Sequence, residues 1–142
     1  MILYLDTSSL VKLYIDENHS AAVKKWAEGA EIIATCRVAY PEAISAMNRR
    51  LRMGDLDRKD YELLVKALSH DWPHYSVLDF DEIAAGSLAA TYGLRGFDAV
   101  HLSAAKMLKS ARPGISLAFS SFDDKLNAAA TSEKMNVLTP RP

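Results

Sequence analysis

The chain has 142 residues, 49% hydrophobic and 25% charged, a composition that fits one globular domain over residues 1–142 and excludes a disordered chain. Its 17 Lys and Arg against 18 Asp and Glu leave a formal net charge of −1, which excludes binding of nucleic acid through bulk positive charge. The single cysteine excludes an internal disulfide, and no apolar run approaches the roughly 20 residues of a membrane-spanning helix, so we expect a cytoplasmic protein without a membrane partner.

Short apolar runs alternate with stretches of helical period in the first third of the chain. Residues 2–5 predict a buried strand, which leads into a helical spacing of Leu10, Leu13 and Tyr14. The next predicted elements are a helix over 20–28, a strand over 31–35 and a helix over 38–53 with a proline in its first turn.

The same alternation continues to the end of the chain. The predicted elements are a helix over 57–72, a strand over 74–78, helices over 79–91 and 97–110, a strand over 115–119, a helix over 123–133 and a short strand over 137–138. Strands that alternate with helices indicate an α/β fold. We therefore expect a mostly parallel sheet of four to five strands with helices on both faces.

Four acidic residues stand just after a predicted strand or at the start of a predicted helix: Asp6, Glu42, Asp98 and Asp123. Each is explained individually as a helix cap, because carboxylates accept hydrogen bonds from free N–H groups in the first turn. Together they would gather at the carboxyl edge of the sheet, where open α/β folds usually bind ligands. Carboxylates that converge repel one another unless they hold protons or cations.

Oxygen ligands without cysteine or a histidine pair favour Mg²⁺ or Mn²⁺ over zinc, and such ions commonly act on phosphate esters. The usual nucleotide-binding loops are absent from the sequence, which contains neither G-x-x-x-x-G-K-[ST] nor G-x-G-x-x-G after the first strand. A phosphorylated-aspartate enzyme is disfavoured, because Asp6 has no second carboxylate two residues later.

Four motifs resemble PIN-domain proteins, and most closely the VapC ribonuclease toxins of type II toxin–antitoxin pairs. They are YLDTSSLVKLY over 4–14, YPEA over 40–43, LRGFDAVHLSAA over 94–105 and SFDDKL over 121–126. The resemblance implies that Asp6, Glu42, Asp98 and Asp123 form the acidic quartet that holds Mg²⁺ or Mn²⁺. It also implies that the first and fourth strands are neighbours, which would bring Asp6 and Asp123 together. Asp124 is the alternative to Asp123 as the fourth acid.

The activity implied by this resemblance is Mg²⁺-dependent hydrolysis of RNA phosphodiester bonds by an endoribonuclease. The implied partners are an RNA substrate, a cognate antitoxin protein and a second copy of the chain in a homodimer. Two alternatives remain open: a non-catalytic RNA-binding or protein-interaction module of the same fold, and a metal-dependent phosphohydrolase of small esters.

Other polar residues have simpler explanations. His101 lies three residues after Asp98 and could act as a general base, but a structural role is favoured. Cys36 is predicted to be a packed side chain. Two basic stretches, 37–59 and 106–112, are either solvated faces or contacts for an RNA backbone.

Overall fold

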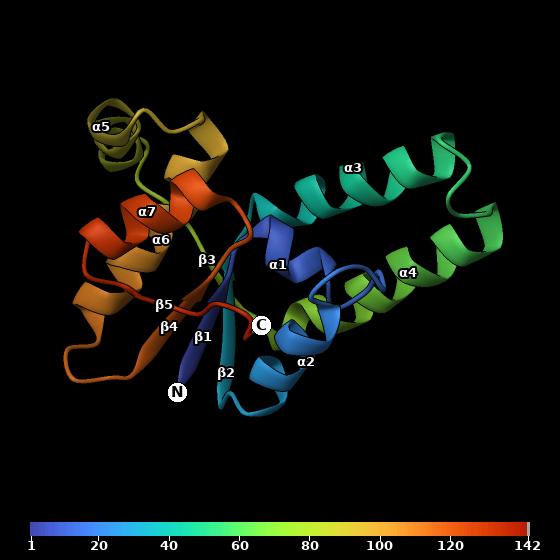
Figure 1. Cartoon of the computed structure of the whole chain (residues 1–142), viewed down its shortest axis with the longest axis horizontal. Coiled ribbons are helices and arrows are strands. Elements are labelled where there is room, and N and C mark those ends of the chain that lie inside the picture. Colours follow the sequence, from blue (N-terminus) through green and yellow to red (C-terminus); the bar gives the residue numbers. More distant parts are fainter. Residues whose placement is uncertain (142) are drawn as a thin grey trace.

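The computed structural model describes residues 1–141 and places five parallel strands in one sheet of order β3–β2–β1–β4–β5 (Figure 1). The strands are β1 (Ile2–Leu5), β2 (Ile32–Cys36), β3 (Ser76–Leu78), β4 (Leu117–Ser120) and β5 (Asn136–Val137). This arrangement confirms the predicted parallel α/β fold. It also confirms that the first and fourth strands are neighbours, with Tyr4 in register with Phe119.

Helices cover both faces of this sheet (Figure 1). They are α1 (Thr7–Val11), α2 (Ser20–Glu28), α3 (Ala39–Arg52), α4 (Arg58–Asp71), the 3₁₀ turn η1 (Trp72–His74), α5 (Glu82–Tyr92), α6 (Gly96–Ala111) and α7 (Asp124–Ser132). Helices α5 to α7 lie on one side and α1 to α4 on the other, with α3 and α4 projecting as an arm. Within residues 1–141, none of these helices is long and apolar enough to span a membrane.

The central strand β1 explains why the sheet is covered twice. Ile2 and Tyr4 join the core beneath α5, α6 and α7, whereas Leu3 and Leu5 join the core beneath α1 to α4. Successive side chains of a strand point to opposite faces, so a strand buried on both sides reads as a continuous apolar run. The ring of Tyr4 is fully buried and stacks on Phe119 with 5.6 Å between centroids.

Several predicted boundaries were wrong by one to three residues. The first helix begins at Thr7 rather than near Leu10, because Asp6 caps it, and it ends at Val11 after little more than one turn. The third strand begins at Ser76 because Pro73 lies in the preceding 3₁₀ turn, which the proline ring favours. The fourth strand begins at Leu117, two residues later than predicted, after a turn in which the Ile115 N–H donates to the Arg112 carbonyl.

The chain leaves β1 and β4 toward opposite faces of the sheet. After β1 it enters α1, and after β4 it enters α7 on the other side. Neighbouring parallel strands whose connections diverge leave a crevice at their carboxyl ends, which is the usual ligand site of open α/β sheets. The residues that follow Leu5 and Ser120 are therefore the first candidates for a ligand site.

Candidate active site

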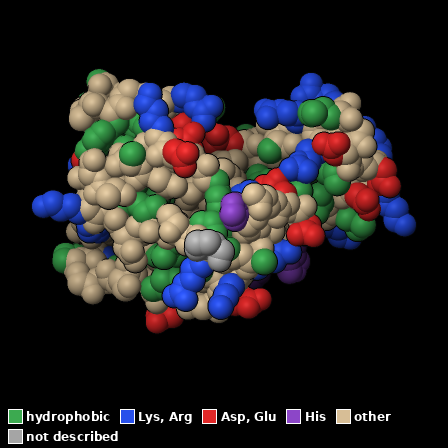
Figure 2. Space-filling view, in the orientation of Figure 1, with side chains coloured by type: hydrophobic (Ala, Val, Ile, Leu, Met, Phe, Trp, Pro, Cys, Tyr) green, Lys and Arg blue, Asp and Glu red, His purple; other side chains and the backbone are tan. Residues whose placement is uncertain are grey.

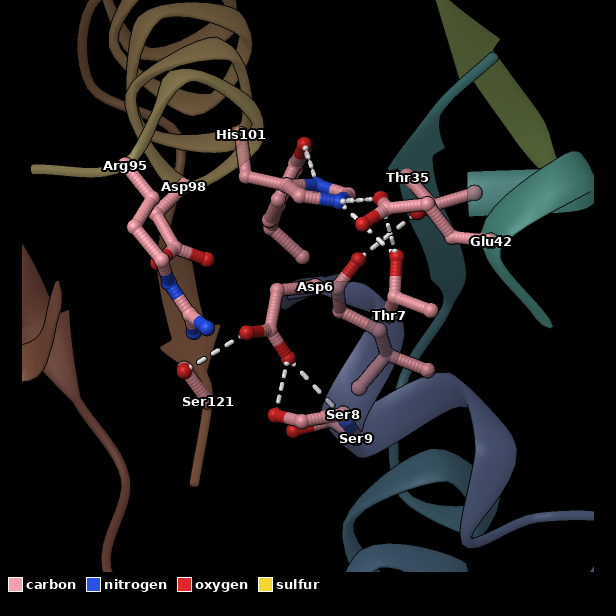
Figure 3. A network of polar contacts seen from close by, with 12 residues as sticks. Asp6, Thr7, Ser8, Ser9, Thr35, Glu42, Arg95, Asp98, His101 and Ser121 are labelled. Carbon is pink, nitrogen blue, oxygen red and sulfur yellow. Dashed lines mark hydrogen bonds and ion pairs between the residues drawn. The ribbon is translucent and has the colours of Figure 1, made fainter. Parts of the chain in front are cut away.

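Asp6 lies at this crevice and accepts hydrogen bonds on both carboxylate oxygens (Figure 3). Oδ1 accepts from the Ser9 N–H at 3.0 Å and from Ser8 Oγ at 2.7 Å, and Oδ2 accepts from Ser121 Oγ at 2.6 Å. The residue is 3% exposed. Burial raises the pKa of the Asp6 carboxyl, against the opposing influence of His101 and of the three hydrogen bonds. A nearby positive charge would therefore stabilise the ionised form of the buried Asp6 carboxylate.

Glu42 reaches the same crevice from the first turn of α3. Its Oε1 accepts from Thr7 Oγ1 at 2.6 Å and from His101 Nε2 at 3.0 Å. Burial acts to raise the pKa of Glu42, but the hydrogen bonds from His101 and Thr7, together with the nearby positive charge of Arg95, outweigh it and lower the pKa. Glu42 is therefore held ionised and in a fixed orientation.

His101 is a buried link between the core and the site. It is 1% exposed, and its Nδ1 lies 2.9 Å from the Tyr4 hydroxyl while Nε2 faces Glu42 and lies 3.0 Å from Thr7 Oγ1. One neutral tautomer satisfies every partner: Tyr4 O–H donates to Nδ1 and Nε2–H donates to Glu42. Burial raises the pKa of Tyr4 well above its usual value, so Tyr4 remains a neutral donor.

Sequence reasoning placed His101 as structural and overlooked Tyr4. Both are buried, as a structural role requires, yet His101 also touches one of the proposed ligands. A signal was present for each. His101 follows Asp98 by one helical turn, and Tyr4 is the only hydroxyl-bearing residue in an otherwise apolar strand.

Asp98 and Asp123 are joined through Arg95, which sequence reasoning also missed. Arg95 Nε donates to Asp98 Oδ2 at 3.1 Å, and Arg95 Nη2 donates to Asp123 Oδ2 at 3.3 Å. The Asp98 side chain is 18% exposed and that of Arg95 is 81% exposed. The positively charged side chain of Arg95 thus bridges two of the four acids. Because it is exposed, it can move away from them without disturbing the packing of the core.

Asp123, not Asp124, contacts the other site residues. Its N–H donates to Ser121 Oγ at 3.1 Å, and Ser121 in turn donates to Asp6. Asp124 is the first residue of α7 and lines a separate cavity with His19. The geometry favours Asp123 over its neighbour as the fourth acid of the site.

Asp123 also caps α7, with Oδ1 accepting from the Leu126 N–H at 2.8 Å. We expect Asp123→Ala to lower the free energy of unfolding by about 1 kcal/mol, because the capping bond is lost. Asp124→Ala should change it by less than about 0.5 kcal/mol. Urea denaturation of both variants measures the difference, and equal stabilities would show that the cap contributes nothing.

The structure places all four predicted acids near the carboxyl ends of β1 and β4, where Figure 3 shows Asp6, Glu42 and Asp98 and the contacts with Arg95 and Ser121 place Asp123. We call Asp6, Glu42, Asp98 and Asp123 the acidic cluster. In Figure 2 red acidic side chains lie in the hollow between the α5–α7 side and the α3–α4 arm, with Lys and Arg on either side. Within residues 1–141, no three acidic, His or Cys side chains lie close enough together to hold a metal ion as they stand.

The donor set of the acidic cluster nevertheless fits a hard divalent cation. All four candidate ligands offer carboxylate oxygens, which Mg²⁺ and Mn²⁺ prefer. The guanidinium of Arg95 lies between Asp98 and Asp123, showing that this position accepts positive charge. Asp98 and Asp123 would hold such a cation in place of the positive charge that Arg95 supplies. Mg²⁺ retains several waters, so few protein ligands suffice.

Basic side chains lie beside the acidic cluster on the α3 side. A cavity of about 460 Å³ is lined by Thr7, Lys12, Arg49 and Arg50. Glu17 pairs with Lys12 at 3.0 Å and also with Arg50, which fixes both cations at the cavity wall. One of the predicted basic stretches therefore contributes charge next to the site, where a phosphate backbone could be held.

Cys36 takes no part in the site. It is fully buried in the core beneath α5 to α7, and burial raises the pKa of its thiol. A buried thiol with a raised pKa is unreactive, because the thiolate is the nucleophilic form. The prediction of a packed side chain is confirmed.

Comparison with known proteins agrees with this fold. The family described as "PIN domain" matches residues 3–131. The ribonuclease VapC46 of Mycobacterium tuberculosis is 31% identical over 143 residues, covering 97% of each chain. Ribonuclease VapC45 of the same species is 30% identical over 132 residues, which cover 91% of this chain and 89% of that protein. A toxin–antitoxin complex from Klebsiella pneumoniae has the same fold, with a TM-score of 0.67, 15% identity and 98% of each chain covered.

Proposed function

The chain belongs to the PIN domain family, and on that premise we propose that it is a Mg²⁺-dependent endoribonuclease, the toxin of a type II toxin–antitoxin pair. The observation that carries this proposal is the acidic cluster, in which the buried carboxylate of Asp6 accepts hydrogen bonds from Ser8 and Ser9 of α1 and from Ser121, the residue after β4. Relatives named ribonucleases, at 30% identity over most of the chain, support the choice of RNA as substrate.

In the proposed mechanism, Asp6, Glu42, Asp98 and Asp123 would hold the ion. When bound, Mg²⁺ would activate water for attack on phosphorus and neutralise charge on the phosphate oxygens. The protein supplies orientation. Ser121 orients Asp6, and His101 orients Glu42, so these two carboxylates are already held in place before the substrate binds.

Arg49, Arg50 and Lys12 would hold the RNA backbone beside the acidic cluster. Phosphate contacts position a nucleic acid without reading its sequence, which suits a short row of cations at the cavity wall. Arg95 would leave Asp98 when the ion binds and could then pair with a phosphate oxygen. Acidic residues that bind the metal and basic residues that bind phosphate would together explain how a chain of nearly zero net charge acts on a polyanion.

The proposed partners are a cognate antitoxin protein and a second copy of the chain in the cytoplasm. The similar structures support an antitoxin, since several are complexes named as toxin with antitoxin or by a paired name. The homodimer rests on family resemblance.

Cleavage of a labelled single-stranded RNA in Mg²⁺ against the same reaction with excess EDTA tests the proposal. We expect cleavage in Mg²⁺ and in Mn²⁺ and none above background in EDTA, because the carboxylates alone cannot activate water. Restoration of cleavage by Mg²⁺ added in excess of the EDTA is the control. Equal loss of RNA in both reactions would refute the proposed mechanism.

The same experiment separates the alternatives. A small-ester phosphohydrolase would release inorganic phosphate from a generic phosphomonoester and leave the RNA intact. A non-catalytic module would bind RNA without cutting it in any metal. The presence of all four acids near one crevice favours a nuclease over such a module.

A further inference from the structure

An apolar cleft of about 650 Å³ adjoins the acidic cluster between α5 and α6. Its walls are formed by Phe80, Ala85, Gly86, Ala89, Phe97 and Val100. Glu42, Arg95 and Asp98 line this cleft as well as belonging to the site described above. We call it the α5–α6 cleft. Its volume lies within the roughly 300–1,000 Å³ of sites that enclose small molecules, and its chemistry differs from that of the acidic cluster.

Phe97 is the prominent apolar group of this cleft. It stands between Gly96 and Asp98 in the first turn of α6, and 59% of it is exposed. A large aromatic side chain next to an acidic site gains nothing from contact with water. Its ring is therefore available to a ligand that binds beside Asp98.

Gly86, in the middle of α5, also lines the cleft. Glycine destabilises a helix interior relative to alanine, so its presence there calls for a reason. A Cβ built on Gly86 would meet no atom within 4 Å, so packing within the protein does not demand glycine. What the missing side chain provides is open space in the cleft, bordered by Ala85 and Ala89.

We propose that the α5–α6 cleft binds one unpaired base of the RNA, adjacent to the phosphodiester that is cut, with the base stacked on Phe97. This inference rests on the proposed function. A cleft lined by an exposed aromatic side chain and by small residues suits a planar ring, and proteins commonly hold unpaired bases by stacking on aromatic side chains. Because the cleft and the acidic cluster share Asp98, a base in the one places its phosphate at the other.

The rim of the cleft favours a nucleotide over an apolar peptide. Arg95 offers a cation for the phosphate, and Glu82 offers a carboxylate that can accept a hydrogen bond from an exocyclic amino group. An apolar peptide would give the carboxylate of Glu82 no hydrogen-bond donor. A base within a duplex could not enter, since both of its faces are stacked, so the substrate must be single-stranded at the point of cleavage.

The first test compares Phe97→Ala with Phe97→Trp. The scissile bond is first mapped with wild-type protein. KM and kcat are then measured for a single-stranded oligonucleotide. The Kd of the same oligonucleotide is measured with Ca²⁺ in place of Mg²⁺. We expect Phe97→Ala to raise KM and Kd about tenfold, the effect of losing one stacked base, and Phe97→Trp to remain within about threefold of wild type. Met107→Ala, on the same helix and 44% exposed but outside the cleft, is the matched control and should not change either constant.

The second test removes the base instead of the ring. An abasic nucleotide placed on one side and then on the other side of the scissile bond should weaken wild-type binding about tenfold at one of the two positions only. At that position the abasic substitution should have no further effect in Phe97→Ala, because both changes remove the same contact. Gly86→Leu, which fills the cleft, should reproduce the loss, whereas Ala90→Leu on the exposed part of α5 should not.

Three outcomes would overturn the inference. The first is that Phe97→Ala binds and cleaves RNA as the wild type does. The second is that the losses of affinity from the abasic site and from Phe97→Ala add. The third is that Phe97→Ala changes the mass of the particle in solution, which would place Phe97 at a contact between copies. Failure of the wild type to cleave any RNA would refute the proposed function instead. The Kd measurements in Ca²⁺ would still decide whether the cleft holds a base.

Discussion

An Asp98→Asn variant is expected to cleave RNA at least about a hundredfold more slowly than the wild type, with no measurable product in an ordinary time course. Asparagine preserves the shape of the side chain but removes the negative charge that would hold the metal ion. The ion-pair partner of Asp98 is Arg95, whose side chain is 81% exposed, so loss of this pair should change the free energy of unfolding by no more than about 1 kcal/mol. Initial rates on a labelled oligonucleotide at saturating Mg²⁺ measure the effect.

Asp6→Asn should abolish cleavage in the same way while the protein remains folded. Burial raises the pKa of Asp6, so a neutral amide at this position removes an unfavourable buried charge at neutral pH. We therefore expect its thermal midpoint to be no lower than that of the wild type. Asp124→Asn is the matched control and should retain activity. Cleavage by either Asp98→Asn or Asp6→Asn at the wild-type rate would remove the carboxylates from the mechanism.

His101→Ala is expected to have the largest effect on stability among the site variants, lowering the free energy of unfolding by about 2–4 kcal/mol. The change leaves a cavity under α6 and removes the partner of the fully buried Tyr4 hydroxyl. It should also slow cleavage about tenfold, because Glu42 loses the hydrogen bond that orients it. Urea denaturation measures the first effect and single-turnover rates the second.

Two further variants separate packing from hydrogen bonding at His101. Tyr4→Phe removes only the hydroxyl that faces Nδ1 and should cost about 1 kcal/mol, with the rings still stacked. His70→Ala, at a side chain that is 80% exposed, should leave stability within about 0.5 kcal/mol of the wild type. A His101→Ala variant as stable and as active as His70→Ala would show that the buried link has no role.

The four acids could be chosen from the sequence because each stands where a strand ends or a helix begins. That position is visible in local pattern, since apolar runs and helical period mark the elements on either side. What local pattern does not supply is the partner of each acid. Arg95 reaches Asp123 across 28 residues, and His101 reaches Glu42 across 59 residues.

The apolar residues 2–5 determined by themselves that a buried strand opens the chain, and the alternation of strands with helices determined a parallel sheet. Both follow from local periodicity, because a strand covered on two faces must be apolar throughout. Only the tertiary structure decided that Tyr4, His101 and Glu42 form one line of hydrogen bonds, and that Phe97 faces a cleft beside Asp98. These contacts join elements far apart in the sequence, so they depend on how helices pack across the sheet and not on the propensity of any one segment.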